Sequence, residues 1–236
     1  MEETKMNWDK KLLQKPMWKE EIKNREQKEQ VAKKIAQKVQ DGDVIGFGSG
    51  STSYLTAIEI ANKIKMENLK ITAIPTSYEM KMLCTYLEIP TATLEEKKPD
   101  WCFDGADEVD HDNWLIKGRG AAMFNEKLNI KASNEVYILV DETKIVNKLG
   151  TNFPIPVECN PKALNLVKEE LYKMGANTIE LRLALKKDGP VITENGNLIL
   201  DVRFNNIDET LERRLKNITG VIETGLFIGY NVNIVK

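Results

Sequence analysis

Apolar residues recur at regular spacings along this chain, and the spacing predicts which segments are helices and which are strands. Within residues 25–40, Val31, Ile35 and Val39 are four positions apart, as on one face of a helix. Residues 44–47 follow as a short apolar run of the kind found in buried strands. We therefore predict a helix and then a strand, separated by an Asp-Gly-Asp turn.

The same alternation continues to residue 140. Further helices are predicted at residues 51–65, 77–87 and 120–132, and further strands at residues 71–74, 101–103 and 136–140. Strands that alternate with helices are typical of βαβ units, in which a parallel sheet is covered on both faces. The ligand crevice of such a sheet lies at the carboxyl ends of its strands.

After residue 150 the order of the elements changes. Strands are predicted at residues 153–157, 178–185, 198–202 and 221–228, and helices at residues 161–174 and 208–217. The order β-α-β-β-α-β is that of a ferredoxin-like α+β unit. The predicted organisation is an N-terminal extension at residues 1–24, an α/β domain at 25–152, a smaller α+β domain at 153–228 and a C-terminal segment at 229–236 that returns to the first sheet.

The composition excludes several classes of protein. The chain has 236 residues, of which 42% are hydrophobic and 30% charged, and its net charge of −2 creates no field that would recruit nucleic acid or an anionic membrane. No apolar run approaches the roughly 18 residues of a membrane-spanning helix. The charged start of the chain also lacks the apolar stretch of a signal peptide. We expect a cytoplasmic protein with no nucleic-acid and no membrane partner.

Cysteine and histidine are too sparse for most metal sites. The three cysteines are far apart and form no CxxC pair, which argues against structural zinc and fits a reducing compartment. The single histidine, His111, lies in the polar stretch VDHDN, which we interpret as a turn. One histidine cannot build a multi-histidine metal centre, so any proton chemistry falls to carboxylates and lysines.

Each predicted strand of the first domain ends in small or polar residues. The four strand ends read GSGST, PTS, DGAD and DET. Because the carboxyl ends of parallel strands meet at one edge of the sheet, these residues point to a single site.

The glycine-rich turn at residues 46–52 suits a phosphate group. Glycines let the backbone approach a ligand, the following helix offers free N–H groups, and the hydroxyls of Ser49, Ser51 and Thr52 add donors. The turn has no Walker A lysine, and its GxGxG spacing is a poor dinucleotide fingerprint. A tight turn with a helix cap is the alternative interpretation.

The acids of DGAD, Asp104 and Asp107, flank a glycine after a predicted strand. Two close acids can have their pKa values pushed apart, which leaves one as proton donor and the other as acceptor. They could instead hold Mg²⁺, or cap a helix and fix a turn. The residues alone leave these three alternatives open.

The stretch KGRGAAMFNEK, residues 117–127, places Lys117 before a glycine turn and Glu126 on the helix that follows. A glutamate beside a lysine on a helix usually faces solvent, but Glu126 shares the side of the helix that we expect to pack on the sheet. Lys144, after VDET, is either a surface lysine or a cation that faces the GSGST turn and pairs with a dianion.

Eight ordered motifs give the chain a resemblance to a known family. They are GFGSGST, IPTS, DGADEVD, KGRGAAMFNEK, VDETK, FPIPVE, GPVITENGNLILDV and GVIETGLF. Over residues 25–235 the chain resembles the type A ribose-5-phosphate isomerases. The resemblance implies a Rossmann-like α/β domain with an inserted ferredoxin-like α+β domain. It also implies a homodimer or homotetramer that interconverts ribose 5-phosphate and ribulose 5-phosphate in the non-oxidative pentose phosphate pathway, without metal or organic cofactor.

The resemblance also implies roles for individual residues. Glu126 falls on the general base, and Asp104, Asp107 and Lys117 fall on the other active-site positions. The implied residues that bind the phosphate of the small phosphosugar are Ser49, Gly50, Ser51, Thr52, Lys144 and Lys28. Two residues depart from the family pattern: Arg119 replaces a glycine, and Asn125 replaces a basic residue before the glutamate.

Other functions fit the sequence less well. A sugar-phosphate-binding transcription regulator would lack the base or the lysine and would carry a DNA-binding segment, for which residues 1–24 are too short. An amino-sugar-phosphate deaminase or a coenzyme A transferase is the alternative among enzymes. The deaminase is expected to use an active-site histidine, and this chain has only His111.

Overall fold

The computed structural model describes residues 21–236, so most of the predicted extension at residues 1–24 lies outside the described part of the chain. Of its last residues, Ile22 is buried and packs against Ala32 and Leu55. The boundaries that we place after residues 24, 152 and 228 stay a prediction.

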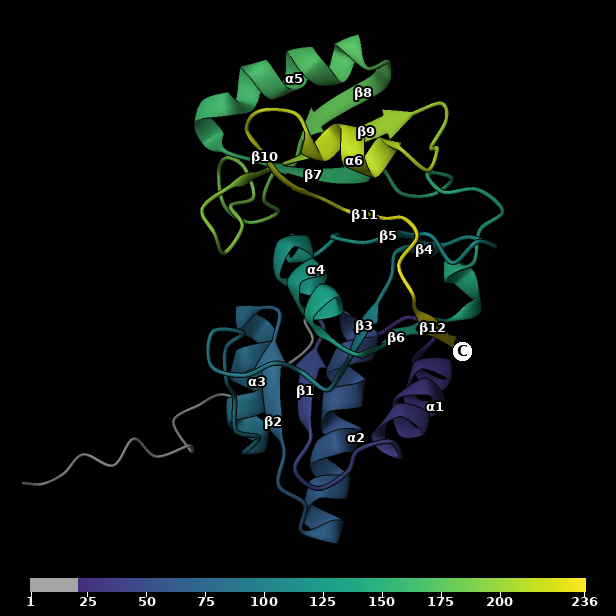
Figure 1. Ribbon diagram of the computed structural model, residues 1–236, viewed down its shortest axis with the longest axis vertical. Helices are drawn as coiled ribbons and strands as arrows, with labels where there is room; N and C mark the ends of the chain where they lie inside the picture. The colour runs from purple at the N-terminus through teal and green to yellow at the C-terminus, as the bar shows by residue number, and fades with distance from the viewer. Residues whose placement is uncertain (1–20) are drawn as a thin grey trace, which may run out of the picture.

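A parallel sheet of five strands forms the lower part of the molecule in Figure 1. Its strands are β1 (Val44–Phe47), β2 (Thr72–Pro75), β3 (Trp101–Gly105), β6 (Glu135–Leu139) and β12 (Asn233–Val235). Their order is β12-β6-β3-β1-β2, and every neighbouring pair is parallel. The α/β fold class expected from the alternating pattern is confirmed.

Side chains that alternate along the central strands build two apolar cores. On β3, Trp101 and Phe103 join one core, while Cys102 between them joins the other. This follows from the two-residue period of a strand. The first core includes residues of α1 (Arg25–Ala36), α2 (Ser51–Glu67) and α3 (Tyr78–Leu87), and the second includes Ile130 of α4 (Met123–Ala132). Helices on both sides leave the carboxyl ends of the strands as the open edge.

Helix α4 begins three residues later than the pattern predicts. Gly118 and Ala121 have φ angles of 105° and 61°, so the chain makes a turn here that a right-handed helix cannot contain. The turn separates Lys117 from the helix that carries Glu126. Helix α1 likewise ends at Ala36, ahead of the predicted residue 40.

An antiparallel sheet of four strands forms the upper part of Figure 1. Its strands are β7 (Ile155–Cys159), β8 (Ala176–Leu181), β9 (Leu198–Phe204) and β10 (Val221–Thr224), in the order β10-β7-β9-β8. The connecting helices are η3 (Pro161–Ala163), α5 (Leu164–Lys173) and α6 (Leu211–Lys216). This is the β-α-β-β-α-β unit that the sequence predicts.

The prediction of a single strand at residues 221–228 is wrong, because the strand is interrupted at Gly225. Strand β10 pairs with β7, whereas β11 (Leu226–Phe227) pairs with β5 (Leu115–Ile116). At the break, a β-carbon on Gly225 would lie 2.1 Å from the carbonyl oxygen of Lys117. Together with β4 (Glu108–Val109), β5 and β11 form a three-stranded sheet between the two larger ones (Figure 1). Within residues 21–236 we find no helix long and apolar enough to cross a membrane.

Candidate active site

Lys117 lies between two carboxylates at the edge of the parallel sheet. Its Nζ is 3.1 Å from Oδ2 of Asp104 and 3.2 Å from Oε2 of Glu126, and it also donates to the carbonyl oxygen of Gly105. Asp104, Lys117 and Glu126 are 2%, 2% and 5% exposed. Three charges are therefore held together away from water by β3, by the segment after β5 and by α4.

Asp104 is held by the backbone around it. Its Oδ1 accepts from the N–H groups of Ser49, at 3.1 Å, and Gly105, at 2.7 Å. Ser49 lies in the turn after β1, so the neighbouring strand end orients the carboxylate. The other oxygen, Oδ2, faces Lys117 and receives no well-aligned hydrogen bond from residues 21–236.

Helix α4 is attached to the sheet by two asparagines. Asn129 donates to the carbonyl oxygen of Ile74 at 2.8 Å, and Asn125 donates to that of Thr76 at 3.1 Å. Both acceptors lie at the carboxyl end of β2. Asn125, one of the two departures from the family pattern, therefore helps to place the helix that carries Glu126.

Burial and mutual charge set the protonation of the three groups. Burial raises the pKa of Glu126 to about 8, and the charge of Asp104 adds to the rise while Lys117 offsets part of it. Burial also raises the pKa of Asp104, again partly offset by Lys117. Burial alone would lower the pKa of Lys117, but the charges of Asp104 and Glu126 outweigh it and raise that pKa. A buried set of two acids and one lysine thus favours one carboxyl that holds a proton near neutral pH.

Oε2 of Glu126 is buried and faces Lys117. It is 3.2 Å from Nζ of Lys117, yet no group within residues 21–236 gives it a well-aligned hydrogen bond. A buried carboxylate oxygen with no hydrogen-bond donor is costly unless a ligand supplies one.

Asp107 is half-buried on the same turn as Asp104. Its Oδ2 accepts from the backbone N–H of Arg119 at 3.1 Å. Its negative charge also acts on Lys117 and Glu126, where it raises the pKa of each. The structure therefore brings together Asp104, Asp107, Lys117 and Glu126, the four residues that the sequence singles out for proton chemistry.

The glycine-rich turn and Lys28 form a second group beside these residues. Nζ of Lys28, a residue only 7% exposed, donates to Oγ of Ser51 at 3.2 Å and lies 3.6 Å from Oδ2 of Asp141. Oγ of Ser49 is 2.8 Å from Oγ1 of Thr76. Gly50 precedes α2 with a φ of 94°, and Thr52 is buried in its first turn. The ends of β1, β2 and β6 meet here, at the carboxyl edge of the parallel sheet.

Other charged residues affect the pKa of Lys28. Burial lowers its pKa, Asp141 opposes this effect, and the charges of Lys144 and Arg119 lower the pKa further. Nζ of Lys144 lies 5.0 Å from the ring centre of Phe153. The charges of Lys144 and Arg119 therefore act on Lys28, the cation that contacts the glycine-rich turn through Ser51.

The structure shows site residues that the sequence analysis missed. Nη1 of Arg182 donates to the carbonyl oxygens of Gly118, at 2.8 Å, and Arg119, at 3.0 Å. The same guanidinium pairs with Asp201 on β9. The antiparallel sheet thereby holds residues 118–120, the turn that follows Lys117. No local sequence signal reveals this contact, because an Arg just after one strand and an Asp on the neighbouring strand are usually a surface pair.

Other candidate residues lie outside this arrangement. His111 is 77% exposed and pairs with Asp112 at 3.3 Å, as expected for a polar turn. The three cysteines are free and buried. No group of three or more His, Cys, Asp or Glu side chains within residues 21–236 is arranged to hold a metal ion.

Comparison with known proteins identifies the family. A family model described as ribose 5-phosphate isomerase A (phosphoriboisomerase A) matches residues 72–235. The ribose-5-phosphate isomerase A of Methanocaldococcus jannaschii is 48% identical over 209 residues, which cover 87% of this chain and 92% of that protein. The protein of the same name from a Synechococcus species is 45% identical over 206 residues, or 86% of this chain and 88% of that protein.

Solved structures agree with the sequence comparison. The structure of ribose 5-phosphate isomerase A from Methanocaldococcus jannaschii has a TM-score of 0.86 at 45% identity, over 90% of this chain and 98% of that one. A D-ribose-5-phosphate isomerase in complex with phospho-erythronic acid has a TM-score of 0.86 at 40% identity, over 90% and 97% of the two chains. In sequence and in three-dimensional structure, the chain belongs to the ribose 5-phosphate isomerase A family.

Proposed function

We infer that this chain interconverts D-ribose 5-phosphate and D-ribulose 5-phosphate, with Glu126 as the base that moves the proton. The observation that carries the assignment is the buried Lys117 with a carboxylate on each side, at 3.1 and 3.2 Å. The family of the chain and its relatives supports the substrate.

The proton transfer between carbons is assigned to Glu126. In the open-chain aldose, Glu126 takes the proton from C2, which leaves a cis-enediolate, and returns a proton to C1 to form the ketose. A positioned general base typically contributes about 10²–10⁴-fold to the rate. The pKa of about 8 makes the carboxylate a stronger base than an exposed glutamate and lets it hold the proton between the two steps.

We assign to Lys117 the stabilisation of the negative charge on the enediolate. Its ammonium group is buried, so its field acts on the substrate oxygens with little screening by water. By analogy with one oxyanion-hole donor, the contribution is on the order of 3 kcal/mol. Lys117 already contacts Glu126, so the base and the stabilising charge lie on the same side of the substrate.

We assign the transfer of the hydroxyl protons to Asp104 or Asp107. The isomerisation removes the proton from the oxygen on C2 and adds one to the oxygen on C1, and the furanose ring must first open. A carboxyl group with a raised pKa, such as Asp104, can carry a proton between these oxygens.

We assign the binding of the phosphate, the non-reacting end of the substrate, to the group around Lys28. The proposed phosphate ligands are Ser49, Gly50, Ser51, Thr52, Lys144 and Lys28. A tightly held phosphate orients the carbons against Glu126, so binding energy away from the reacting atoms lowers the barrier.

We also propose that the protein is a cytoplasmic homodimer or homotetramer, as the family resemblance implies. The free, buried cysteines fit a reducing compartment. Light scattering coupled to size-exclusion chromatography measures the mass of the assembly directly, and a mass of 26.9 kDa would contradict the proposal.

The decisive experiment replaces Glu126 with Gln, which keeps the size of the side chain and removes the base. Turnover of ribose 5-phosphate and deuterium exchange at C2 should both fall by about 10²–10⁴-fold. A folded Glu126→Gln protein that retains both activities would refute the role of Glu126. In the parent protein, inhibition by a chelator would instead favour a metal ion at the DGAD acids.

A further inference from the structure

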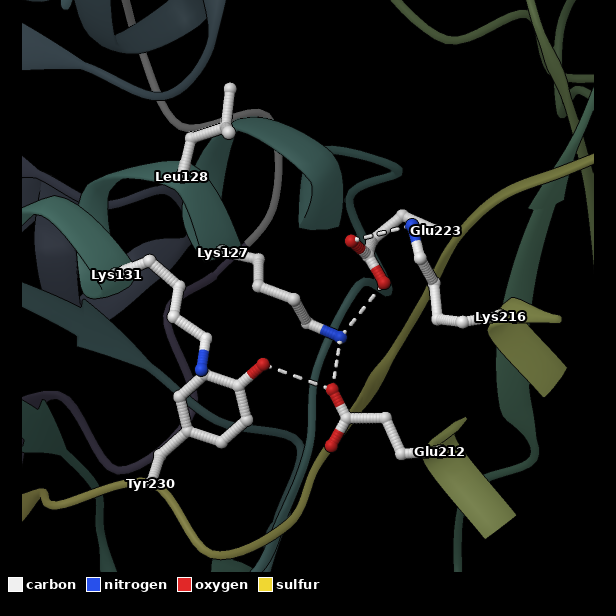
Figure 2. Close-up of a pocket in the computed structure, with 7 residues that line it drawn as sticks. All are labelled: Lys127, Leu128, Lys131, Glu212, Lys216, Glu223 and Tyr230. Carbon is white, nitrogen blue, oxygen red and sulfur yellow. Dashed lines mark hydrogen bonds and ion pairs between the residues drawn. The ribbon is translucent and has the colours of Figure 1, made fainter. Parts of the chain in front are cut away.

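Lys127 follows Glu126 in the sequence, but its side chain extends away from the proposed active site, toward α6, β10 and β11. Its Nζ lies 2.7 Å from Oε1 of Glu212 on α6 and 2.9 Å from Oε1 of Glu223 on β10. It also donates to the carbonyl oxygens of Thr224, at 2.9 Å, and Leu226, at 2.8 Å. Figure 2 shows the ammonium group directed at the two carboxylates.

This arrangement is stiffer than a surface ion pair. An ammonium group has three N–H donors, and here four oxygens from three different elements surround it. Lys127 is 6% exposed, and its Nζ lies 4.5 Å from the ring centre of Phe227. Charge-assisted hydrogen bonds in a buried position are stronger than neutral ones, so α4 is tied firmly to β10, β11 and α6.

The segment that Lys127 holds also holds Lys117. Thr224 and Leu226 flank Gly225, whose carbonyl oxygen accepts from the backbone N–H of Lys117 at 2.9 Å. A side chain at Gly225 would collide with the carbonyl oxygen of Lys117, at 2.1 Å. One three-residue segment therefore contacts the backbone of Lys117 and, through Lys127, the helix that carries Glu126.

We propose that Lys127 is a positioning residue that sets the separation of Lys117 and Glu126 by fixing α4 to residues 224–226. The proposal rests on the proposed role of Glu126 as the base. It explains why the strand is interrupted between β10 and β11. The interruption places the carbonyl oxygens of Thr224 and Leu226 around Nζ of Lys127, and that of Gly225 against the backbone N–H of Lys117.

The pocket around Lys127 has charged residues in its lining, as a ligand site would, but its two carboxylates are already paired. It has a volume of about 260 Å³ and is lined by Lys127, Leu128, Lys131, Glu212, Lys216, Glu223 and Tyr230. Lys216 pairs with Glu223 at 3.1 Å, and the hydroxyl of Tyr230 donates to Glu212 at 3.0 Å. The dashed lines of Figure 2 join these groups to one another, which is what a structural tie requires.

The test replaces Lys127 with Met, which keeps an unbranched side chain and removes the charge. Displacing the base from the proton by a fraction of an ångström should lower kcat about ten- to hundredfold. KM should stay within about threefold, because the proposed phosphate ligands lie on other elements. The acidic limb of the pH profile of kcat should also move by more than about half a pH unit, because the field of Lys117 on Glu126 changes with their separation.

Lys131→Met is the matched control. Lys131 lies one helical turn further along α4, is exposed, lines the same pocket and has its Nζ 4.3 Å from the ring centre of Tyr230. The control makes the same change of charge on the same helix, and its kcat should stay within about twofold of the parent value.

A double variant separates positioning from folding. Lys127→Met leaves Glu212, whose side chain is 13% exposed, without its cation, which can prevent folding by itself. In Lys127→Met with Glu212→Gln that charge is removed, while Glu223 keeps Lys216. The double variant should regain thermal stability without regaining kcat. If kcat returns together with the melting temperature, or if the pH limb of the folded variants stays in place, the proposal is wrong.

The two proposals can fail separately. An active Glu126→Gln protein would remove the assignment of the base. An inactive Glu126→Gln protein together with parent-like kcat in a folded Lys127 variant would overturn the positioning role alone.

Discussion

Gly48 lies so close to Asp104 that a β-carbon on residue 48 would stand 2.2 Å from Cγ of the carboxyl group. It would also stand 2.6 Å from Cα of Asp104, so a rotation of the side chain could not relieve the clash. The N–H of Gly48 donates to the carbonyl oxygen of Phe103 at 2.8 Å, which presses the end of β1 against β3. The glycine-rich turn is therefore shaped by the carboxylate beside it as well as by any phosphate that it binds.

Gly48→Ala should damage activity as well as stability. The overpacked contact costs about 1–3 kcal/mol of unfolding free energy, whereas a shift of Asp104 by about 1 Å costs about a hundredfold in kcat/KM. Urea unfolding and steady-state kinetics measure the two effects on the same protein. Parent-like kcat/KM in a folded variant would show that the position of Asp104 does not matter.

Activity should depend on pH through Glu126. Below its pKa of about 8 the group is protonated and cannot act as a base, so kcat/KM of the free enzyme should fall with decreasing pH, approaching tenfold per unit. Initial rates in a series of buffers at constant ionic strength measure the profile. A limb centred near pH 4.5, the ordinary value for glutamate, would contradict the effect of burial.

The same group makes stability depend on pH. Because the pKa of Glu126 is raised in the folded state, folded protein binds the proton more tightly than unfolded protein does. Its contribution to stability is therefore greatest below pH 4.5 and is lost as the pH rises through about 8. Glu126→Gln should become more stable than the parent protein toward pH 8 and above. Urea unfolding of both proteins at pH 5 and at pH 9 measures the change, and a constant difference between them would contradict it.

Lys28→Met should weaken substrate binding. Lys28 is buried against Ser51 and stands in the proposed phosphate site, so its loss should raise KM for ribose 5-phosphate by about tenfold or more and weaken inhibition by inorganic phosphate in parallel. Lys33, exposed on the same helix, provides the control: Lys33→Met should leave both values unchanged. An unaltered KM in Lys28→Met would remove Lys28 from the phosphate site.

Arg119→Gln should reveal what this departure from the family pattern does. The guanidinium lowers the pKa of Lys28 and so lies within electrostatic range of the proposed phosphate site. The backbone contacts of Arg119 to Asp107 and Arg182 do not involve its side chain, so the turn should keep its shape. We expect KM to rise about threefold at low salt and the difference to shrink at high salt, because the charge is exposed. A salt-independent change would point to an effect on the turn instead.

The order of the elements could be predicted from the sequence because each depends on local spacing. Val31 and Ile35 mark a helix face whatever they pack against, and both are buried in the first core together with Val39, which lies beyond the end of the helix at Ala36. The polar residues at four strand ends likewise indicated one site, because parallel strands share a carboxyl edge. For that reason Asp104 and Asp107 could be selected before their contacts were seen, whereas the roles of Lys117 and Glu126 came from the family resemblance.

Short strands and long-range contacts could not be predicted in this way. Strands β4, β5 and β11 have two residues each, too few to show a period. Gly225 looks like an interior residue of one strand, and only its contact with Lys117 shows why the strand breaks there. Lys127 and Thr224 are 97 residues apart, so nothing near Lys127 in the sequence indicates which oxygens it binds.

The sequence by itself determined the two sheets, the helices between their strands and the residues that can move protons, because apolar period and residue type are local properties. Only the tertiary structure decided how those residues behave. Glu126 on an exposed face would be an ordinary acid, but folding buries it beside Asp104, and this raises its pKa to about 8. Burial and distance, which arise from packing between remote segments, turn a glutamate into a candidate base.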